Sequence, residues 1–470
     1  MITNNLNQNL FRTGRKLVAR WAARLASMRA PAIVGASLCL AAPLAAYAGP
    51  LKVGAAKVDI TPSPLPQNFL GVLDPIYARA IVVESDGNRA AFITVDTGGI
   101  STDIWKTVSE RAAKELNIPV DQMMLTATHT HSAPFGRTGD AYVELIYRSV
   151  KEAAAALQPA QMAYGTGVSY INVNRNIIDP ETHRWWEGPN YDGPTDKTVA
   201  VVRFETPKGE PIAVYYNYGV HAVLTGNLDL ISGDLPGATS TYIEDSLGKD
   251  VIAVYSNGAA GDQNPIYFQQ TYDLRAIRID DYAARGEDIS NGMPPGGQGM
   301  DRSNPEVAKL MEQQKQMKLS MGQMLGEEVL HVMRRSLERP VSEASIRGMR
   351  KTVSCPGRVR LDKGRAGYAG QYEDADPVDI QLSLLKIGDT VIGGVNGEVF
   401  TTIAQRFKQL SPYKHTMMTT LTNGTAKSGY IPNDAAYGQY TFEVISSRLK
   451  PGCAETAIAE GLVDLIDAVE

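Results

Sequence analysis

The feature that most constrains the fold is a strand, helix, strand order early in the chain. Residues 77–84 and 89–96 are rich in β-branched residues and flank a turn of Asp, Gly and Asn, which predicts a hairpin. Residues 102–117 repeat apolar side chains at helical spacing, and an apolar run follows at 123–125. A strand, a helix and a second strand in this order predict a βαβ unit, so His129, just after the run, would lie at the carboxyl end of a strand.

The rest of the chain continues the same alternation of strands and helices. Further strands are predicted at 199–205, 212–218, 251–255, 379–387, 390–395 and 416–421. Further helices are predicted at 140–157, 237–247, 305–335, 401–410 and 454–469. We therefore expect an α/β (α+β mixed) fold, with residues 49–470 forming one large catalytic domain of mixed sheets and helices and a metal site at strand ends.

The first 48 residues have the pattern of a secretory signal peptide. Six Arg and Lys residues and no acidic residue precede an apolar run at 30–47, which ends in the small-residue cleavage pattern Ala46-Tyr47-Ala48. An uncleaved membrane anchor is the alternative, but the run contains two prolines and is barely long enough to cross a bilayer. We expect export, to the periplasm or outside the cell, with cleavage after Ala48.

Charge and cysteine content narrow the possible partners. Removal of residues 1–48 would change the formal net charge from −5 to −11, and an acidic exported protein is a poor candidate for binding nucleic acid. No second long apolar run is present in the sequence, so membrane contact is expected to be peripheral at most.

After removal of residues 1–48, Cys355 and Cys453 would be the remaining cysteines, and they can either pair or stay as thiols. The oligomeric state stays open.

Several metal-ligand side chains follow predicted strands. His129 and His131 are two residues apart, so an extended strand would project both imidazoles from one face. His221 and Glu398 each follow a further apolar strand at the start of a turn. Two imidazoles and a carboxylate leave a zinc ion with an open position for water, as a hydrolytic site requires.

Motifs along most of the chain resemble one enzyme family. The relevant segments are Val53-Gly-Ala-Ala-Lys-Val-Asp-Ile-Thr61, Tyr77-Ala-Arg-Ala80, Ala127-Thr-His-Thr-His-Ser132, Asn172-Val-Asn-Arg175, Ile231-Ser-Gly-Asp234, Asn396-Gly-Glu-Val-Phe-Thr-Thr402, and Gly429-Tyr430 with Tyr437. In sequence and in order they resemble the N-terminal catalytic domain of the neutral, non-lysosomal ceramidases. The resemblance implies a zinc-dependent hydrolase of an N-acyl amide bond, in ceramide (N-acylsphingosine) or a related lipid amide.

The resemblance also assigns roles to individual residues. It implies one zinc ion per chain, held by His129, His221, Glu398 and Tyr430. His131 matches the histidine that exchanges protons with the zinc-bound water and the leaving amine, and Arg175 matches an active-site arginine.

Two further aspartates have two possible roles each. Asp96 and Asp234 could orient ligand histidines or could cap buried turns.

The chain departs from the family pattern in two places. Where the family has a catalytic serine before a proline, this chain has Asn264, which cannot be a nucleophile. The attacking group is then expected to be zinc-activated water, with Asn264 or Tyr437 donating a hydrogen bond to the developing oxyanion. The chain also ends at Glu470, directly after the catalytic region, so we expect no C-terminal β-sandwich domain.

Three alternatives remain open on sequence grounds. An amidohydrolase-type barrel would use His183 and His221 as its later ligands, but it would leave Glu398 without a role. A non-catalytic homologue would hold zinc or lipid without turnover. A hydrolase of the same fold could act on a non-sphingolipid amide or ester.

Overall fold

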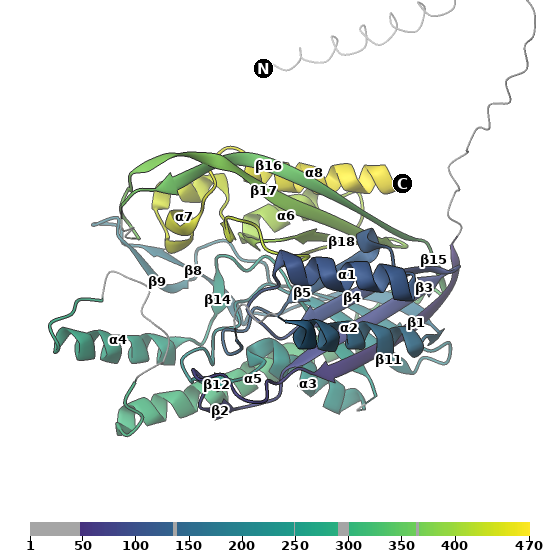
Figure 1. The fold of residues 1–470 in the computed structure, drawn as a ribbon, viewed down its shortest axis with the longest axis horizontal. Coiled ribbons are helices and arrows are strands. Elements are labelled where there is room, and N and C mark those ends of the chain that lie inside the picture. Colours follow the sequence, from purple (N-terminus) through teal and green to yellow (C-terminus); the bar gives the residue numbers. More distant parts are fainter. Residues whose placement is uncertain (1–47, 135–138, 249, 290–299, 363–365) are drawn as a thin grey trace, which may run out of the picture. The chain divides into compact units, whose positions relative to one another are not determined.

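The predicted strand, helix, strand unit is present in the computed structural model (Figure 1). β3 (Tyr77–Ser85) and β4 (Asn88–Val95) form an antiparallel hairpin. Asp86 and Gly87 form its turn with φ of 49° and 76°, a conformation that Gly adopts readily and Asp tolerates. After α1 (Thr102–Leu116), β5 (Met123–Ala127) pairs in parallel with β4. Both strands therefore end at the same edge of the sheet.

The structure describes residues 48–134, 139–248, 250–289, 300–362 and 366–470. The predicted signal peptide lies outside these residues, apart from Ala48. Among the helices that are described, none is both long enough and apolar enough to cross a membrane.

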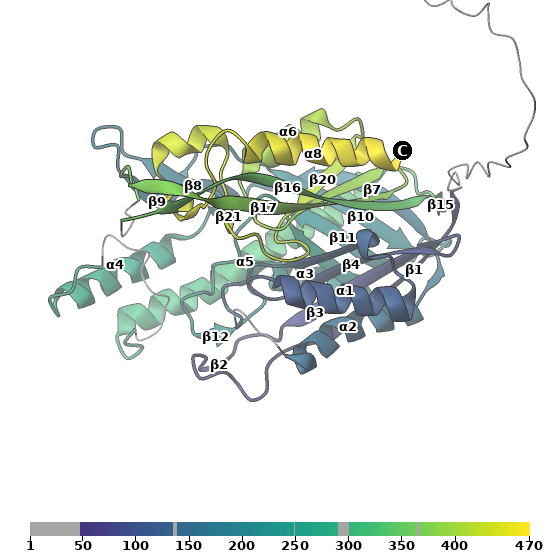
Figure 2. The same ribbon diagram turned by 45° about the horizontal axis from the view of Figure 1, so that its top comes forward.

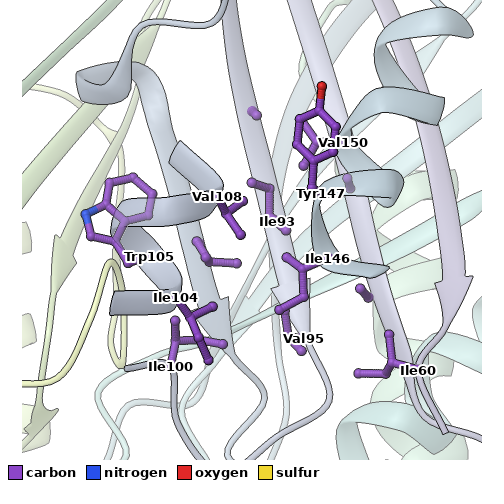
Figure 3. Packing of buried hydrophobic residues seen from close by; sticks show 14 of the residues in the cluster. Ile60, Ile93, Val95, Ile100, Ile104, Trp105, Val108, Ile146, Tyr147 and Val150 are labelled. Carbon is purple, nitrogen blue, oxygen red and sulfur yellow. The ribbon is translucent and has the colours of Figure 1, made fainter. Parts of the chain in front are cut away.

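The first sheet is covered on one face by two helices. Its strand order is β15-β1-β3-β4-β5, where β1 is Gly49–Asp59 and β15 is Glu343–Ala344, and β6 (Gln158–Pro159) also pairs with β1. α1 and α2 (Asp140–Ala155) lie on this sheet, and Figure 3 shows their apolar side chains facing it. Ile104, Val108, Ile146 and Val150 of the helices are buried in one cluster with Ile93 of β4. The apolar residues that repeat at helical spacing thus form the faces of α1 and α2 that pack on the first sheet.

A second sheet packs behind the first. Its order is β13-β11-β10-β7, with bounds Ile252–Asn257, Pro211–Tyr218, Thr198–Glu205 and Gln161–Val168. Its outer face is covered by α3 (Asp234–Leu247) and α5 (Pro305–Arg335), whose Leu235 and Leu325 share a buried cluster with Val214. Phe92 of the first sheet and Tyr215 of the second meet with ring centroids 4.5 Å apart. The arrangement is therefore helices, sheet, sheet, helices.

A third sheet completes the mixed fold. It has the order β16-β17-β18-β20, with bounds Ile346–Arg360, Tyr372–Ile387, Thr390–Val395 and His415–Thr419. α6 (Thr401–Leu410) and α8 (Ala454–Val469) pack on one face of it (Figure 2), with Phe407 and Leu462 in their shared core. β16 was not predicted. The fold class is confirmed, and the open, largely antiparallel sheets of the described residues do not form the barrel of the amidohydrolase alternative.

Shorter elements complete the fold of the described residues. They are β2 (Gly71–Val72), η1 (Val120–Gln122), β8 (Asn172–Ile178), β9 (Trp185–Asn190), β12 (Leu230–Ile231), β14 (Gln263–Pro265), α4 (Gln269–Ala283), β19 (Glu398–Val399), β21 (Tyr430–Ile431), η2 (Asp434–Gln439) and α7 (Phe442–Ser446).

A disulfide joins Cys355 of β16 to Cys453 at the start of α8, with the Cα atoms 5.7 Å apart and a sequence separation of 98. Because a link over so long a loop restricts the unfolded chain, we expect the double replacement Cys355→Ala and Cys453→Ala to lower the free energy of unfolding by about 2–4 kcal/mol. Denaturant titration of both proteins measures this. The reduced wild-type protein should show the same loss, and equal stability with and without reductant would contradict the expectation.

Candidate metal centre

Four predicted site residues from distant parts of the chain meet at one edge of the fold. His129 follows β5 by two residues, and His221 follows β11 by three. Glu398 begins β19 and Tyr430 begins β21, and these short parallel strands place the two residues directly opposite each other. The structure therefore brings together His129, His221, Glu398 and Tyr430, as the sequence motifs implied.

Both histidines direct one ring nitrogen at the same carboxylate oxygen. The Nε2 atoms of His129 and His221 lie 3.1 and 3.2 Å from Oε2 of Glu398. The two imidazole rings meet edge to face, with centroids 4.8 Å apart. Both histidines are almost fully buried, at 5% and 1% exposure. Three donor atoms suited to a transition metal thus converge in a protected place.

Backbone carbonyl groups fix which nitrogen of each imidazole carries a proton. Nδ1 of His129 lies 2.6 Å from the Gly98 carbonyl oxygen, and Nδ1 of His221 lies 2.7 Å from that of Ala260. A carbonyl oxygen only accepts hydrogen bonds, so both Nδ1 atoms donate and, in the neutral rings, the lone pairs are on Nε2. Two lone pairs then face a carboxylate oxygen, an arrangement that a cation between them would stabilise. The residues present therefore fit a bound metal ion.

His129 and His131 lie close together, but not because of the strand geometry predicted from the sequence. β5 ends at Ala127, and His129 has a left-handed backbone with φ of 64°. The expectation that an extended strand projects both imidazoles side by side is therefore wrong. The turn still brings the rings close, because their centroids are 5.0 Å apart and nearly perpendicular. His129, His131 and His221 form a group that can hold a metal ion. Strained backbone of this kind is common at functional sites.

The pKa values of the cluster reflect burial and mutual contact. Burial lowers the pKa of His129, but the Glu398 carboxylate and the Gly98 carbonyl raise it, and the net change is upward. Burial and the Arg175 charge lower the pKa of His221 to about 4. Burial and the two neighbouring histidines lower the pKa of His131 well below its usual value. Burial raises the pKa of Glu398, but His129 and His221 bring it well below its ordinary value.

Arg175 is held beside the cluster by three polar partners. It is only 5% exposed, and its Nε donates to Glu443 at 2.6 Å. Nη2 donates to the Tyr430 hydroxyl at 3.1 Å, and Nη1 lies 3.4 Å from Oδ1 of Asn264. The structure therefore places Arg175 beside the cluster and not at the surface, as the resemblance implied.

Tyr430 connects the arginine to the cluster. Burial and the Glu398 charge raise the pKa of its phenol, while Arg175 acts in the opposite direction. The hydroxyl accepts a hydrogen bond from Arg175, which leaves its own proton directed elsewhere. A cation bound beside Glu398 would favour the phenolate, so the surroundings are compatible with Tyr430 as a ligand.

The two predicted oxyanion donors occupy different surroundings. Asn264 lies in β14, only 1% exposed, where Nδ2 donates to Oε1 of Glu187 at 2.9 Å. Tyr437 lies in η2 and packs in a small cluster with Phe400 and Val444. Neither belongs to the residues that line the cavity beside His131. The structure thus brings Asn264 close to Arg175 but does not place Tyr437 at the cavity wall.

Neither candidate aspartate contacts a site histidine through a described hydrogen bond. Asp96 accepts from Arg79 at 3.1 Å and from the Tyr77 backbone at 2.8 Å. Asp234 accepts from the backbone and the hydroxyl of Thr225. Asp234 therefore fixes a buried loop, which was the other possibility for it. Asp96 instead pairs with a buried arginine and with the first residue of β3.

A cavity opens beside the cluster, and we call it the His131 cavity. Its volume is about 680 Å³. Its wall includes His131, Arg175 and Tyr430. Much of the rest of the lining is apolar, with contributions from Phe69, Trp185, Phe268, Leu274, Met300 and Phe442. A cavity of this size and lining suits a ligand with both a polar group and an apolar chain.

Sequence reasoning missed several residues that shape the site. Gly98 and Ala260 act through backbone carbonyls, which leave no side-chain signature. Glu443, fully buried against Arg175, was given no role. Asp262 accepts a hydrogen bond from the Thr401 backbone at 3.0 Å, and burial raises the pKa of its carboxyl to about 6. Glu187 had no signal in the sequence.

Comparison with known proteins agrees with this geometry. Residues 53–271 match the family model described as neutral/alkaline non-lysosomal ceramidase, N-terminal. The chain is 29% identical over 262 residues to neutral ceramidase of Pseudomonas aeruginosa, which covers 48% of this chain and 39% of that protein. It is 28% identical over 224 residues to neutral ceramidase of Drosophila melanogaster, covering 41% of this chain and 32% of that protein. The matches thus span about a third of the length of these curated relatives.

The fold is also that of a solved ceramidase. The structure superposes on the crystal structure of Pseudomonas aeruginosa neutral ceramidase with a TM-score of 0.67 and 19% identity, over 89% of this chain and 74% of the other. Glu398 and Tyr430 lie beyond the matched residues 53–271. Residues 53–271 thus match the neutral/alkaline non-lysosomal ceramidase family in sequence, and the chain shares the fold of a solved neutral ceramidase.

Proposed function

We propose that this protein is a zinc-dependent hydrolase of the N-acyl amide bond of a lipid, either ceramide or a related amide. The observation that supports it most is the convergence of two imidazole nitrogens and one carboxylate oxygen beside a partly apolar cavity, whose wall includes His131 and Tyr430. The match of residues 53–271 to the ceramidase family and the similarity to neutral ceramidases support an amide of the ceramide type as the substrate.

The proposed metal site consists of His129, His221, Glu398 and Tyr430. Nitrogen and oxygen donors of this kind suit zinc, and the carbonyl groups behind both histidines hold the rings in the correct orientation. A zinc ion bound there supplies a Lewis acid that polarises a carbonyl group and makes a water molecule more acidic.

The protein's own residues would perform the proton transfers and orient the amide. His131 lines the cavity beside the cluster and is placed to take a proton from water and return it to the leaving nitrogen. Arg175, fixed by Glu443, presents its positive charge to the same cavity. A charge held in place before reaction stabilises negative charge that develops on the carbonyl oxygen.

The apolar part of the His131 cavity would hold the acyl chain. Phe69, Phe268 and Phe442 line it, and their burial of a hydrocarbon chain would contribute about 0.8 kcal/mol for each methylene group. The same side chains would exclude bulk water from the reacting amide.

Export belongs to the same proposal. The basic and apolar pattern of residues 1–48 supports secretion to the periplasm or the exterior, where a ceramide-type substrate in an outer membrane surface would be accessible. Amino-terminal sequencing of the secreted protein should find Gly49 at its start.

Product analysis tests the proposed activity. The purified protein would be incubated with zinc and with a panel of short- and long-chain ceramides, N-acyl ethanolamines and matched esters. We expect release of fatty acid and free amine in equal amounts, measured by mass spectrometry, together with one zinc per chain. Zinc binding without release from any substrate would contradict the proposal and favour a non-catalytic binding protein, and release from esters alone would exclude an amidase.

A further inference from the structure

Polar side chains gather on one wall of the His131 cavity, formed by β8, β9 and α4. Arg175, Glu187, Tyr272 and Arg275 line the cavity there. The Glu187 side chain is only 12% exposed, and its Oε2 lies 3.5 Å from Nη1 of Arg275. This wall therefore combines a largely buried carboxylate with guanidinium groups beside an otherwise largely apolar cavity.

Asn264 lies directly behind this wall and between its charges. Its Nδ2 donates to Oε1 of Glu187 at 2.9 Å, and its Oδ1 faces Nη1 of Arg175 at 3.4 Å. One amide thus separates a carboxylate from a guanidinium. Opposite charges attract strongly in a buried setting, so loss of the amide would let Glu187 turn toward Arg175 and away from the cavity.

We propose that Asn264 is a positioning residue which keeps Glu187 apart from Arg175, and that Glu187 thereby accepts a hydrogen bond from an O–H or N–H group on the amine side of the substrate. An ionised carboxylate only accepts hydrogen bonds, and Glu187 carries the cavity-lining carboxylate that Asn264 holds. This inference rests on the proposed amide hydrolysis and names the residue that selects the polar part of the substrate.

The geometry argues against direct action of Asn264 on the oxyanion. A donor to the oxyanion must face the reacting carbonyl oxygen. Asn264 does not line the His131 cavity, and its Nδ2 donates to Glu187 instead. Its effect on the substrate would therefore pass through Glu187.

A double-mutant cycle with Asn264→Ala and Glu187→Gln tests this assignment. The substrates would be N-dodecanoyl ethanolamine and N-dodecanoyl ethylamine, which differ by one hydroxyl group. We expect the wild-type KM to be about tenfold or more lower for the hydroxylated amide, as for a hydrogen bond to a charged group. Each variant should lose this preference with little change in kcat, and the double variant should lose nothing further.

A binding measurement gives the same test without turnover. Calorimetry with 2-(dodecylamino)ethanol and N-ethyldodecylamine should show tighter binding of the hydroxylated amine by the wild type and equal binding by both variants. Glu187→Gln preserves the side-chain shape, so it still decides the matter if Asn264→Ala does not fold. Asp273→Asn is the matched control, because it removes a carboxylate of α4 that does not line the His131 cavity; it should keep the preference.

Two results would overturn the assignment. The first is additive losses in the double variant. The second is a fall in kcat of about a hundredfold or more in Asn264→Ala for both amides with the hydroxyl preference unchanged, since that would place Asn264 on the oxyanion. If the wild type hydrolyses neither these amides nor any ceramide of the panel, the proposed function fails, and the amine-binding pair still decides the role of Glu187.

Discussion

Replacement of Glu398 by Gln is expected to remove both bound zinc and activity. The carboxylate supplies the one negative charge that both site histidines face, through contacts of 3.1 and 3.2 Å. The amide of Gln is neutral and would present either a weaker donor oxygen or an NH₂ group to the metal. Because loss of an outer partner alone costs about 10–100-fold in metal affinity, loss of a direct ligand should cost more than about 100-fold.

The expected loss of activity follows from the chemistry that the metal supplies. Lewis-acid stabilisation is worth several kcal/mol, so kcat should fall by at least about a thousandfold at limiting zinc. Zinc per chain by mass spectrometry and kcat on a ceramide substrate are the two measurements. The exposed Glu373→Gln of β17 is the matched control and should keep full zinc and full activity. An active Glu398→Gln protein that contains no zinc would refute the metal site.

The early part of the fold was predictable because its sequence repeats have a direct physical cause. Apolar residues at helical spacing on α1 pack on the first sheet, and Asp86 and Gly87 adopt the left-handed turn that their sequence favours. β16 escaped prediction for an equally physical reason. Much of the strand is solvent-exposed, and its pairing with β17 shifts register between Cys355 and Gly357, so it lacks the alternation of a half-buried strand.

The site was predictable in its side chains and much less so in its geometry. His129, His221 and Glu398 could be selected because each follows a strand, whereas Tyr430 was identified only through a family motif. The left-handed backbone of His129 overturned the simple strand argument, because side chains two residues apart share a face only where the chain is extended. The carbonyl groups of Gly98 and Ala260 orient the histidines without any sequence signature.

Asn264 shows that a departure from a family pattern can point to a site residue without revealing which side chains that residue contacts. The sequence alone established that asparagine replaces a serine, and it left a direct role on the oxyanion as the simplest expectation. The structure places the amide between Glu187 and Arg175, contacts that arise from β9 and β8 and that no local pattern near residue 264 reveals. Long-range partners of this kind need the folded chain.

Replacement of His131 by Gln is expected to separate metal binding from catalysis. In the proposed site the metal is held by His129, His221, Glu398 and Tyr430, so the variant should still bind one zinc per chain. Its kcat should fall by about 10²–10⁴-fold, the usual contribution of a general acid and base, because Gln cannot accept and return a proton. KM should change much less, since Gln nearly preserves the volume of the side chain at the cavity wall.

The zinc content of this variant decides between two ligand sets that the structure permits. His131 lies close enough to His129 and His221 for the three imidazoles to share a metal ion, and Glu398 offers the alternative third ligand. If His131 were a ligand, His131→Gln would lose zinc as Glu398→Gln does, and added zinc would partly restore its activity. If His131 moves protons, excess zinc restores nothing. His331→Gln, an exposed histidine of α5, is the matched control and should leave zinc content and kcat unchanged.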